Sequence, residues 1–461
     1  MNDALETDEK PAAAAGTTDD AMPVAAIREA VAAEDQTALA ALLEPLHEAD
    51  VADLLEQLAR PERLALIRLW GIQLDGSVLS ELEEGVRDEI VAELPDHILA
   101  AAVQEMETDD VVYLAEDLDE PQQERILRAL DAVDRVAVEA SLQYGDYTAG
   151  RLMQREVVVA PEHWGVGDAL DFMRAEEWLP ESFYDLIIVD PQMRPVGMVS
   201  LGRIMGAPRP TRLKELMDED FRTIRVEEGQ EDVAYVFNKY HLISAPVVDT
   251  GGRLVGVITI DDAMEVLEEE TEEDLRRLGG VGDEELSDGV VQIARSRFPW
   301  LFINVFTALV SASVIGLFSE TIEVIVALAI LMPIVSAMGG NAGTQSLTVT
   351  VRAIATRSIT AANLWRVIRR EGAVGLVNGI TFATIMGLIA GWYFADSGLG
   401  MVIATAMLGN MVVAAFAGVL VPIGLEKVGI DPALASSIFV TTMTDAFGFF
   451  AFLGLATFFL L

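Results

Sequence analysis

Long uncharged stretches alternate with short charged segments in the last third of the chain. Five such stretches follow Arg297, at 298–319, 324–351, 372–395, 397–425 and 432–461. A helix that crosses the hydrocarbon core of a bilayer needs about 20 mostly apolar residues. Helices of soluble proteins carry a polar face, and these stretches do not. The pattern predicts an all-α membrane domain of five transmembrane helices at 297–461.

Apolar residues recur at helical spacing in short segments between about residues 24 and 142. The segment that begins at Asp50 returns 60 residues later at Asp110, and the two copies end on Pro61 and Pro121. Each proline stands where the first turn of another helix is expected. Stacked helical hairpins of this kind form superhelices. We therefore predict an α-helical superhelical N domain at 23–150, after a disordered acidic tail at 1–22.

The pattern changes to short apolar strands that alternate with helices at 151–262. The strand at 186–190 returns at 245–249, and a second strand follows each copy, at 195–199 and 254–258. The two copies align at an offset of 59 residues. This repeat predicts a duplicated α/β unit.

An acidic segment at 263–296 connects this unit to the first membrane stretch. Asp262, Glu265, Glu269 and Glu273 recur at three- and four-residue steps, so they share one face of a helix. Like charges at this spacing repel, and a divalent cation bound to the carboxylate oxygens removes the repulsion. The segment predicts an acidic connecting helix that senses metal; the alternative is a solvated acidic face, typical of adaptation to high salt.

The formal net charge of −43 lies entirely in residues 1–296, because the chain from Arg297 onward has seven basic and seven acidic residues. This acidity excludes binding of nucleic acid through its phosphates. A hydrophobic content of 52% is too high for a disordered acidic protein. The absence of cysteine excludes disulfides and thiolate metal sites and fits a reducing compartment. The first ten residues have no features of a cleaved signal peptide.

Basic residues of the membrane half are concentrated in two loops. Lys427 lies between the fourth and fifth stretches, whereas the loops after the first and third stretches have no basic residue. The loop after the second stretch and its flanks contain Arg352, Arg357, Arg366, Arg369 and Arg370. The positive-inside rule then predicts a multi-pass protein of the cytoplasmic (inner) membrane, with the N-terminal module in the cytoplasm and the C-terminus outside.

The second membrane stretch contains Pro333 and the run Gly339-Gly-Asn-Ala-Gly-Thr-Gln-Ser346. Proline and three glycines argue against a regular helix throughout, and freed carbonyls at membrane depth are tolerated where they line a wet cavity. Asn341 and Gln345 would add side-chain oxygens there. The alternative is close packing through small residues, the role that we expect for the glycines of the third stretch, namely Gly375, Gly379, Gly387 and Gly391.

Asp445 is the one charged residue of the fifth stretch. A carboxylate near the middle of a membrane costs several kcal/mol unless it faces water, a cation or a partner. No basic side chain lies within the five stretches to neutralise it, so a permeating cation is the natural counter-charge, with Thr441, Thr442 and Thr444 as further oxygens. The alternative is a protonated aspartic acid used in helix packing or proton coupling.

These residues together resemble the MgtE family of magnesium transporters and channels, and the duplicated α/β unit resembles a tandem pair of CBS domains. The domain order also matches, and the likeness covers the chain after the tail. It is carried by Thr148-Ala-Gly-Arg-Leu-Met153, the glycine run at 339–346, Arg352-Ala-Ile-Ala-Thr-Arg357, Trp365-Arg-Val-Ile-Arg-Arg-Glu371, Asp431-Pro-Ala-Leu and Thr441-Thr-x-x-Asp445.

The resemblance implies a homodimer, formed through the membrane and CBS domains, with a pore between the subunits. It implies that Asp445 of each subunit meets hydrated Mg²⁺ and that Glu320 and Asp431 lie near the two ends of the path. The pore residues implied in all are Asp445, Asn341, Gly340, Glu320, Asp431 and Thr441.

The resemblance also implies that cytosolic Mg²⁺ bridges acidic groups of the soluble module and holds the pore shut. The sensor residues would be Asp109, Asp110, Asp262, Glu265, Glu270, Glu273 and Asp274. His241 departs from the pattern, because relatives can carry an acid at this place. Thr259 and Asp262 stand where CBS domains contact the ribose of an adenine nucleotide such as ATP, whereas Arg203 in the first unit departs from that pattern.

The expected function is Mg²⁺-selective uptake by a channel or transporter that is driven by the membrane potential and is not an enzyme. The chain contains no P-loop, and none is needed, because two charges gain about 4.6 kcal/mol per 100 mV. The alternatives are a proton-coupled secondary transporter of divalent cations, which usually shows paired repeats of broken helices, and a membrane-anchored regulatory sensor.

Overall fold

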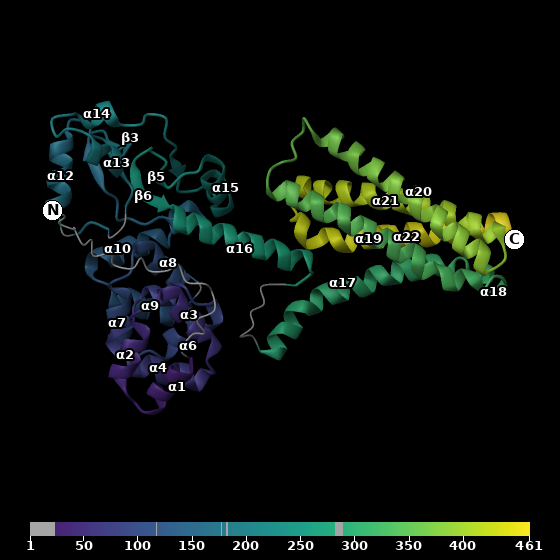
Figure 1. Ribbon diagram of the computed structural model, residues 1–461, viewed down its shortest axis with the longest axis horizontal. Coiled ribbons are helices and arrows are strands. Elements are labelled where there is room, and N and C mark those ends of the chain that lie inside the picture. Colours follow the sequence, from purple (N-terminus) through teal and green to yellow (C-terminus); the bar gives the residue numbers. More distant parts are fainter. Residues whose placement is uncertain (1–23, 117, 177, 181–182, 282–288) are drawn as a thin grey trace, which may run out of the picture. The chain divides into compact units, whose positions relative to one another are not determined.

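The computed structural model describes residues 24–116, 118–176, 178–180, 183–281 and 289–461. The chain divides into two compact units, with the boundary between Ala263 and Met264. The first unit consists of short helices followed by α/β elements, and the second consists mainly of long helices (Figure 1).

Short amphipathic helices form the first part of the first unit, and their apolar faces share one core in which Leu54, Ile90 and Leu114 are fully buried. Pro61 and Pro121 lie in the first turns of α4 and α9, as the 60-residue repeat predicts. The helices are α1 (Val24–Ala32), α2 (Gln36–Leu43), α3 (Glu48–Gln57), α4 (Arg60–Trp70), the 3₁₀ turn η1 (Gly71–Gln73), α5 (Ser77–Ser80), α6 (Glu84–Glu93), α7 (Asp96–Val103), α8 (Thr108–Glu116), α9 (Glu120–Ala129) and α10 (Ala132–Ser141).

Two α/β units with the same topology complete the first unit of the chain. In each, a short first strand pairs parallel with the second, and the second pairs antiparallel with the third, in the orders β1-β2-β3 and β4-β5-β6. The elements are α11 (Ala149–Leu152), β1 (Val159–Pro161), α12 (Val166–Ala175), β2 (Asp185–Val189), β3 (Pro195–Ser200), α13 (Leu201–Gly206), α14 (Leu213–Leu216), β4 (Ile224–Arg225), α15 (Gln230–Tyr240), β5 (Ser244–Val248) and β6 (Leu254–Thr259).

Residues 59 apart in the sequence play the same part in the two copies. Asp190 Oδ1 accepts from the backbone N–H of Arg194, and Asp249 Oδ1 accepts from that of Arg253. Gly256 lies against the chain of the preceding linker, where a Cβ atom would come within 2.7 Å of the Gln154 carbonyl oxygen. The predicted duplication is confirmed down to its turns.

Long apolar helices form the second unit, and within the described residues five of them have the length and composition to cross a membrane. The predicted fold class is therefore confirmed. The helices of this unit, with the connecting helix before them, are α16 (Ile260–Leu278), α17 (Val290–Gly316), α18 (Ser319–Val324), α19 (Ala327–Ala355), α20 (Leu364–Tyr393), α21 (Ser397–Val428) and α22 (Pro432–Leu460).

The connecting helix and the first membrane helix have other limits than the hydrophobic pattern indicates. α16 already begins at Ile260 and ends at Leu278, before Gly280, whose φ of +70° stops a helix. α17 begins at Val290 instead of near residue 298. The polar turns before residue 298 and the apolar stretch after it form one helix, which contains Pro299.

Glycines of α20 pack closely against α21, as predicted. A Cβ atom at Gly375 would lie 2.5 Å from Ala415 Cβ, and one at Gly387 would lie 2.9 Å from Ala404 Cβ. α20 and α21 run side by side along most of their length (Figure 1). Small residues let helix backbones approach in a membrane, where association depends on packing.

The glycine run does not interrupt the second membrane helix. α19 is one continuous α-helix that contains Pro333 and the whole run, so the predicted departure from a regular helix was wrong. A Cβ atom at Gly339 would lie 2.1 Å from Asn410 Nδ2, and one at Gly343 would lie 2.6 Å from Val440 Cγ1. These two glycines serve close packing, whereas a Cβ atom at Gly340 would meet nothing within 4 Å.

Candidate functional site

Asp445 lies in the middle of α22 and is bound by a hydroxyl group of α19. Ser336 Oγ donates to Asp445 Oδ1 at 2.5 Å, and both side chains are half-buried. Ser336 lies one turn before Gly339, in the part of α19 that packs on α22. A hydroxyl group that donates to a carboxylate leaves the negative charge of the carboxylate in place.

Further polar groups of α19 and α22 lie on the surface of this unit. Asn341 and Thr441 are exposed, and Gly340 is half-exposed. The hydroxyl groups of Thr442 and Thr444 donate instead to carbonyl oxygens of their own helix, at 2.7 and 2.9 Å. Asn341 and Thr441 are therefore presented outward, whereas Asp445 is half-buried.

Asp431 begins α22 and makes two defined contacts. Its Oδ1 accepts from the backbone N–H of Ala433 at 2.8 Å, which caps the helix, and its Oδ2 accepts from Arg277 Nη1 of α16 at 2.7 Å. Leu278, which follows Arg277 in α16, packs on the apolar cluster that contains Leu347 and Val440. Asp431 thus attaches the end of the connecting helix to α22. Glu320 is exposed in the first turn of α18.

Carboxyl groups of the first unit gather around the start of α8 and the start of α16. Asp109 is buried in α8, and Asp262 of α16 is the strongest charged neighbour acting on it. Asp262 Oδ2 accepts from the Thr259 hydroxyl group at 2.6 Å and from the Thr259 N–H at 3.1 Å. We use the name acidic cluster for the carboxyl groups of Glu107, Asp109, Asp110, Glu156, Asp261 and Asp262.

Burial and mutual repulsion weaken these acids. Burial, then repulsion by Glu156 and Asp110, raises the pKa of Glu107 to about 7. Burial chiefly raises the pKa of Asp110 to about 6 and that of Asp262 to about 7, and it raises the pKa of Asp109 well above its usual range. Burial and mutual repulsion thus disfavour the negative charge of the acidic cluster, and a bound cation would relieve both.

The described residues contain no group of three acidic or histidine side chains already converged on a single metal position. In proteins Mg²⁺ keeps several waters and is often held by one or two carboxylates, so a converged set of three is not a requirement for it.

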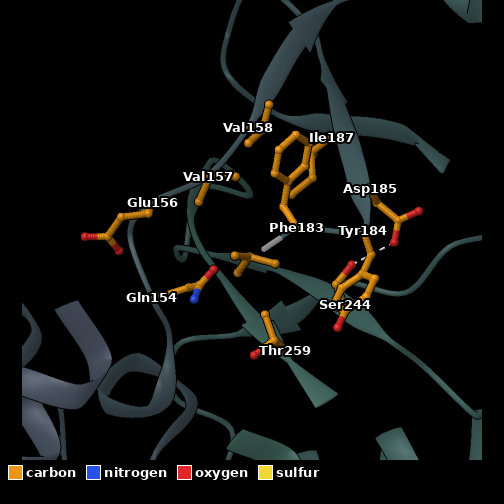
Figure 2. A pocket seen from close by; sticks show the side chains of 11 residues that line it. Gln154, Glu156, Val157, Val158, Phe183, Tyr184, Asp185, Ile187, Ser244 and Thr259 are labelled. Carbon is orange, nitrogen blue, oxygen red and sulfur yellow. Dashed lines mark hydrogen bonds between the residues drawn. The ribbon is translucent and has the colours of Figure 1, made fainter. Parts of the chain in front are cut away.

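A pocket between the two α/β units shares Glu156 with the acidic cluster. Gln154, Glu156 and Thr259 line the pocket, and so do Asp185 and Ser244, whose side chains are joined by a 2.9 Å hydrogen bond (Figure 2). Asp262 is not among the lining residues, because its carboxylate is turned to Thr259.

Hydrogen bonds link the pocket walls directly to the N domain. Gln154 Nε2 donates to Glu107 Oε2 at 2.5 Å, and the Thr108 hydroxyl group donates to Glu156 Oε1 at 2.5 Å. With the bond from Thr259 to Asp262, three wall residues have a partner in or beside the acidic cluster.

Comparison with known proteins agrees with this architecture. Family models described as the MgtE intracellular N domain, the CBS domain and a divalent cation transporter match residues 46–147, 149–209 with 213–269, and 332–455. The magnesium transporter MgtE of Thermus thermophilus is 32% identical over 448 residues, which cover 93% of this chain and 97% of the relative. The chain belongs to the MgtE family.

A second MgtE relative and a solved cytosolic domain are also similar to this chain. The magnesium transporter MgtE of Bacillus subtilis is 28% identical over 91% of this chain and 93% of its own length. A crystal structure of the cytosolic domain of the Mg²⁺ channel MgtE in complex with ATP is 31% identical and covers 53% of this chain and 99% of its own, with a TM-score of 0.50.

Several side chains of the two sites in this MgtE protein have no signal in the sequence. Ser336 is an ordinary small polar residue of a membrane helix. Glu107 and Glu156 join the acidic cluster only through the tertiary fold, since 49 residues separate them.

Only part of the predicted sensor set converges in the first unit. The structure brings Asp109, Asp110 and Asp262 together there. The other predicted sensor residues lie further along α16, where Glu273 forms an ion pair with Arg277 of the next turn. They are Glu265, Glu270, Glu273 and Asp274.

Proposed function

We propose that this MgtE-family membrane protein carries Mg²⁺ across the cytoplasmic membrane along a path lined by α19 and α22. The observation that carries the proposal is Asp445, a mid-helix carboxylate held by Ser336 in a unit that presents Asn341 and Thr441 at its surface. A polar face of this kind is costly toward lipid. A passing cation neutralises the Asp445 carboxylate. Amide and hydroxyl oxygens of the protein replace part of the outer hydration shell of the cation.

A second copy of the chain completes this path. Oxygens from one subunit surround a hydrated ion on one side only, whereas a C₂ pair presents the same face twice. Two Asp445 carboxylates then balance both charges of Mg²⁺. The homodimer also removes the exposed polar groups from lipid. The membrane potential supplies the driving force, about 4.6 kcal/mol per 100 mV for two charges moving inward.

Cytosolic Mg²⁺ closes the path by binding to the acidic cluster. Ion binding offsets the repulsion among Glu107, Asp110 and Asp262 and so favours the compact arrangement in which these groups are close. α16 begins at this cluster and ends at the contact between Arg277 and Asp431. This helix therefore transmits the state of the cluster to the cytoplasmic end of α22. The first unit is cytoplasmic in this arrangement.

An adenine nucleotide such as ATP binds in the pocket between the two CBS units. Ser244, Asp185 and Thr259 offer polar groups there, and the related cytosolic domain was crystallised with ATP. Because Thr259 also holds Asp262, an occupant of the pocket acts on the acidic cluster.

Uptake of Mg²⁺ into proteoliposomes that contain an Mg²⁺ indicator tests the transport proposal. Asp445→Ala and Asp445→Asn are expected to abolish uptake, whereas Asp396→Asn retains it, because an asparagine still caps α21 where Asp396 accepts from Gly398 N–H. Normal uptake by either Asp445 variant would overturn the assignment of the path. A proton gradient that drives uptake at zero membrane potential would favour the proton-coupled alternative.

A further inference from the structure

Asn410 is a fully buried amide in α21 at the junction with α19 and α22. Its Nδ2 donates to the carbonyl oxygen of Val335 at 3.0 Å. Its Oδ1 has no hydrogen-bond partner among the described residues, although it is shielded from solvent. A buried amide oxygen without a partner destabilises a fold, and a hydrogen bond between membrane helices contributes little to stability on average. Stability of the bundle therefore does not account for an amide at this position.

Two glycines on different helices make room for this amide. A Cβ atom would lie 2.1 Å from Nδ2 at Gly339 of α19 and 2.7 Å from it at Gly448 of α22. The side chain thus sits between these backbones and sets how closely each approaches α21. Any other residue at either glycine would push the amide away.

The same two glycines lie one turn after the pair of residues on the proposed ion path. Ser336 precedes Gly339 by three residues, and Asp445 precedes Gly448 by three residues. Residues three apart on a helix are surface neighbours. The hydrogen bond from Asn410 goes to Val335, the residue directly before Ser336. One side chain therefore fixes both helices at the level where Ser336 binds Asp445.

We propose that Asn410 is a positioning residue of the ion path, which holds α19 and α22 at the separation and rotation that let the Ser336 hydroxyl group reach Asp445. The proposal rests on the proposed function, because it gives Asn410 no role unless Asp445 lies on the path. It differs from a packing role, in which only the volume between the two glycines matters.

Two variants separate position from packing. Asn410→Leu keeps a side chain of similar size and removes both polar groups. In Asn410→Ala/Gly339→Ala, the new methyl group at residue 339 takes the space that the amide leaves. Both variants are expected to give a monodisperse protein with a thermal midpoint no lower than that of the wild type. Both are expected to lower maximal Mg²⁺ uptake by about tenfold or more, since displacement of a reacting group by about 1 Å can cost up to 10²-fold.

A double-mutant cycle identifies the route through Ser336. If Asn410 acts by positioning the hydroxyl group, Ser336→Ala/Asn410→Leu transports no more slowly than the slower single variant, whereas independent roles multiply the two losses. Selectivity for Mg²⁺ over Ca²⁺ should fall to a similar extent in Ser336→Ala, in Asn410→Leu and in the double variant. A general loss of packing does not produce such a common change.

The outcomes distinguish this inference from the proposed function. If Asp445→Ala abolishes uptake but Asn410→Leu transports Mg²⁺ with normal rate and selectivity, the positioning role is overturned and the path is left intact. Loss of the folded protein in both variants, or multiplicative losses in the cycle, also overturns it and makes Asn410 a packing residue. Uptake that survives Asp445→Ala removes the proposed function itself.

Discussion

Replacement of Asp262 by asparagine should stabilise the soluble module in the absence of divalent ions. Burial, against the opposing hydrogen bonds from Thr259, raises the pKa of this buried acid from 3.8 to about 7. A shift of about 3 units corresponds to a penalty on the order of 4 kcal/mol for the charged form in the folded state. Asparagine removes the charge and keeps an oxygen that accepts from Thr259. Asparagine also places an NH₂ group where an acceptor oxygen stood, and accommodating this donor offsets part of the gain, so the net stabilisation is about 2 kcal/mol.

The sign of the pH dependence follows from the raised pKa. The folded state binds more protons than the unfolded state between pH 4 and pH 7, so the wild-type module loses stability as the pH rises through this window. Above pH 7 the penalty is complete. At pH 4 the advantage of the Asp262→Asn variant is largely lost, because the wild-type carboxyl group is then protonated in the folded state and about half protonated in the unfolded state. Glu107 and Asp110 act in the same direction.

Thermal unfolding of residues 24–278, with and without Mg²⁺, measures both effects. At pH 8 in EDTA the midpoint of Asp262→Asn should exceed that of the wild type by about 4–8 °C, at 2–4 °C per kcal/mol for a module of this size. Millimolar Mg²⁺ should raise the wild-type midpoint more than that of the variant. Asp50→Asn is the matched control, because Asp50 is the exposed counterpart of Asp110 in the repeat. A wild-type module at least as stable as the variant at pH 8 in EDTA would refute the reasoning.

Three further results are expected. Arg277→Gln should raise Mg²⁺ uptake several-fold at a high internal Mg²⁺ concentration, because the side chain no longer holds Asp431, and a wild-type response in the proteoliposome assay would contradict this role. Gly375→Leu should lower the stability of the detergent-solubilised protein by about 1–3 kcal/mol through overpacking against α21, whereas Gly424→Ala, which meets nothing within 4 Å, should leave the thermal midpoint unchanged. Ser244→Arg should abolish calorimetric binding of ATP to the soluble module while the Mg²⁺-dependent midpoint shift remains, and unchanged ATP affinity would place the nucleotide elsewhere.

Periodicity made the architecture predictable from the sequence. Membrane helices, helical repeats and the duplicated α/β unit each follow from a hydrophobic pattern or an internal offset, which does not depend on distant contacts. The start of α22 was predictable as well, because an aspartate before a proline is a typical helix N-cap. The capping bond of Asp431 therefore has a local cause, whereas its ion pair with Arg277 joins residues 154 apart and depends on the tertiary fold.

The glycine run shows why local rules failed in the membrane. Glycine lowers helix propensity in water, but in a bundle Gly339 and Gly343 each give room to a neighbouring side chain and are held by it. Tertiary packing outweighs propensity at these positions. The acidic cluster shows the opposite case, since the resemblance implied a sensor set that contains Asp109, Asp110 and Asp262, whereas their raised pKa values arise chiefly from burial in the tertiary fold.

The two halves of the molecule use carboxylates under opposite conditions. Asp445 has a hydroxyl group as its neighbour, and the proposed cation meets a carboxylate with no acid beside it along the described part of α22. The acidic cluster has other carboxylates as neighbours, so a proton relieves the same repulsion as a cation. Because the pKa values of Glu107 and Asp262 lie near 7, protons and Mg²⁺ compete for these groups close to neutral pH. Mild acidification should therefore weaken binding of Mg²⁺ to the cluster. Protonation itself favours the same compact arrangement, so closure at low pH would need less Mg²⁺ than closure at high pH.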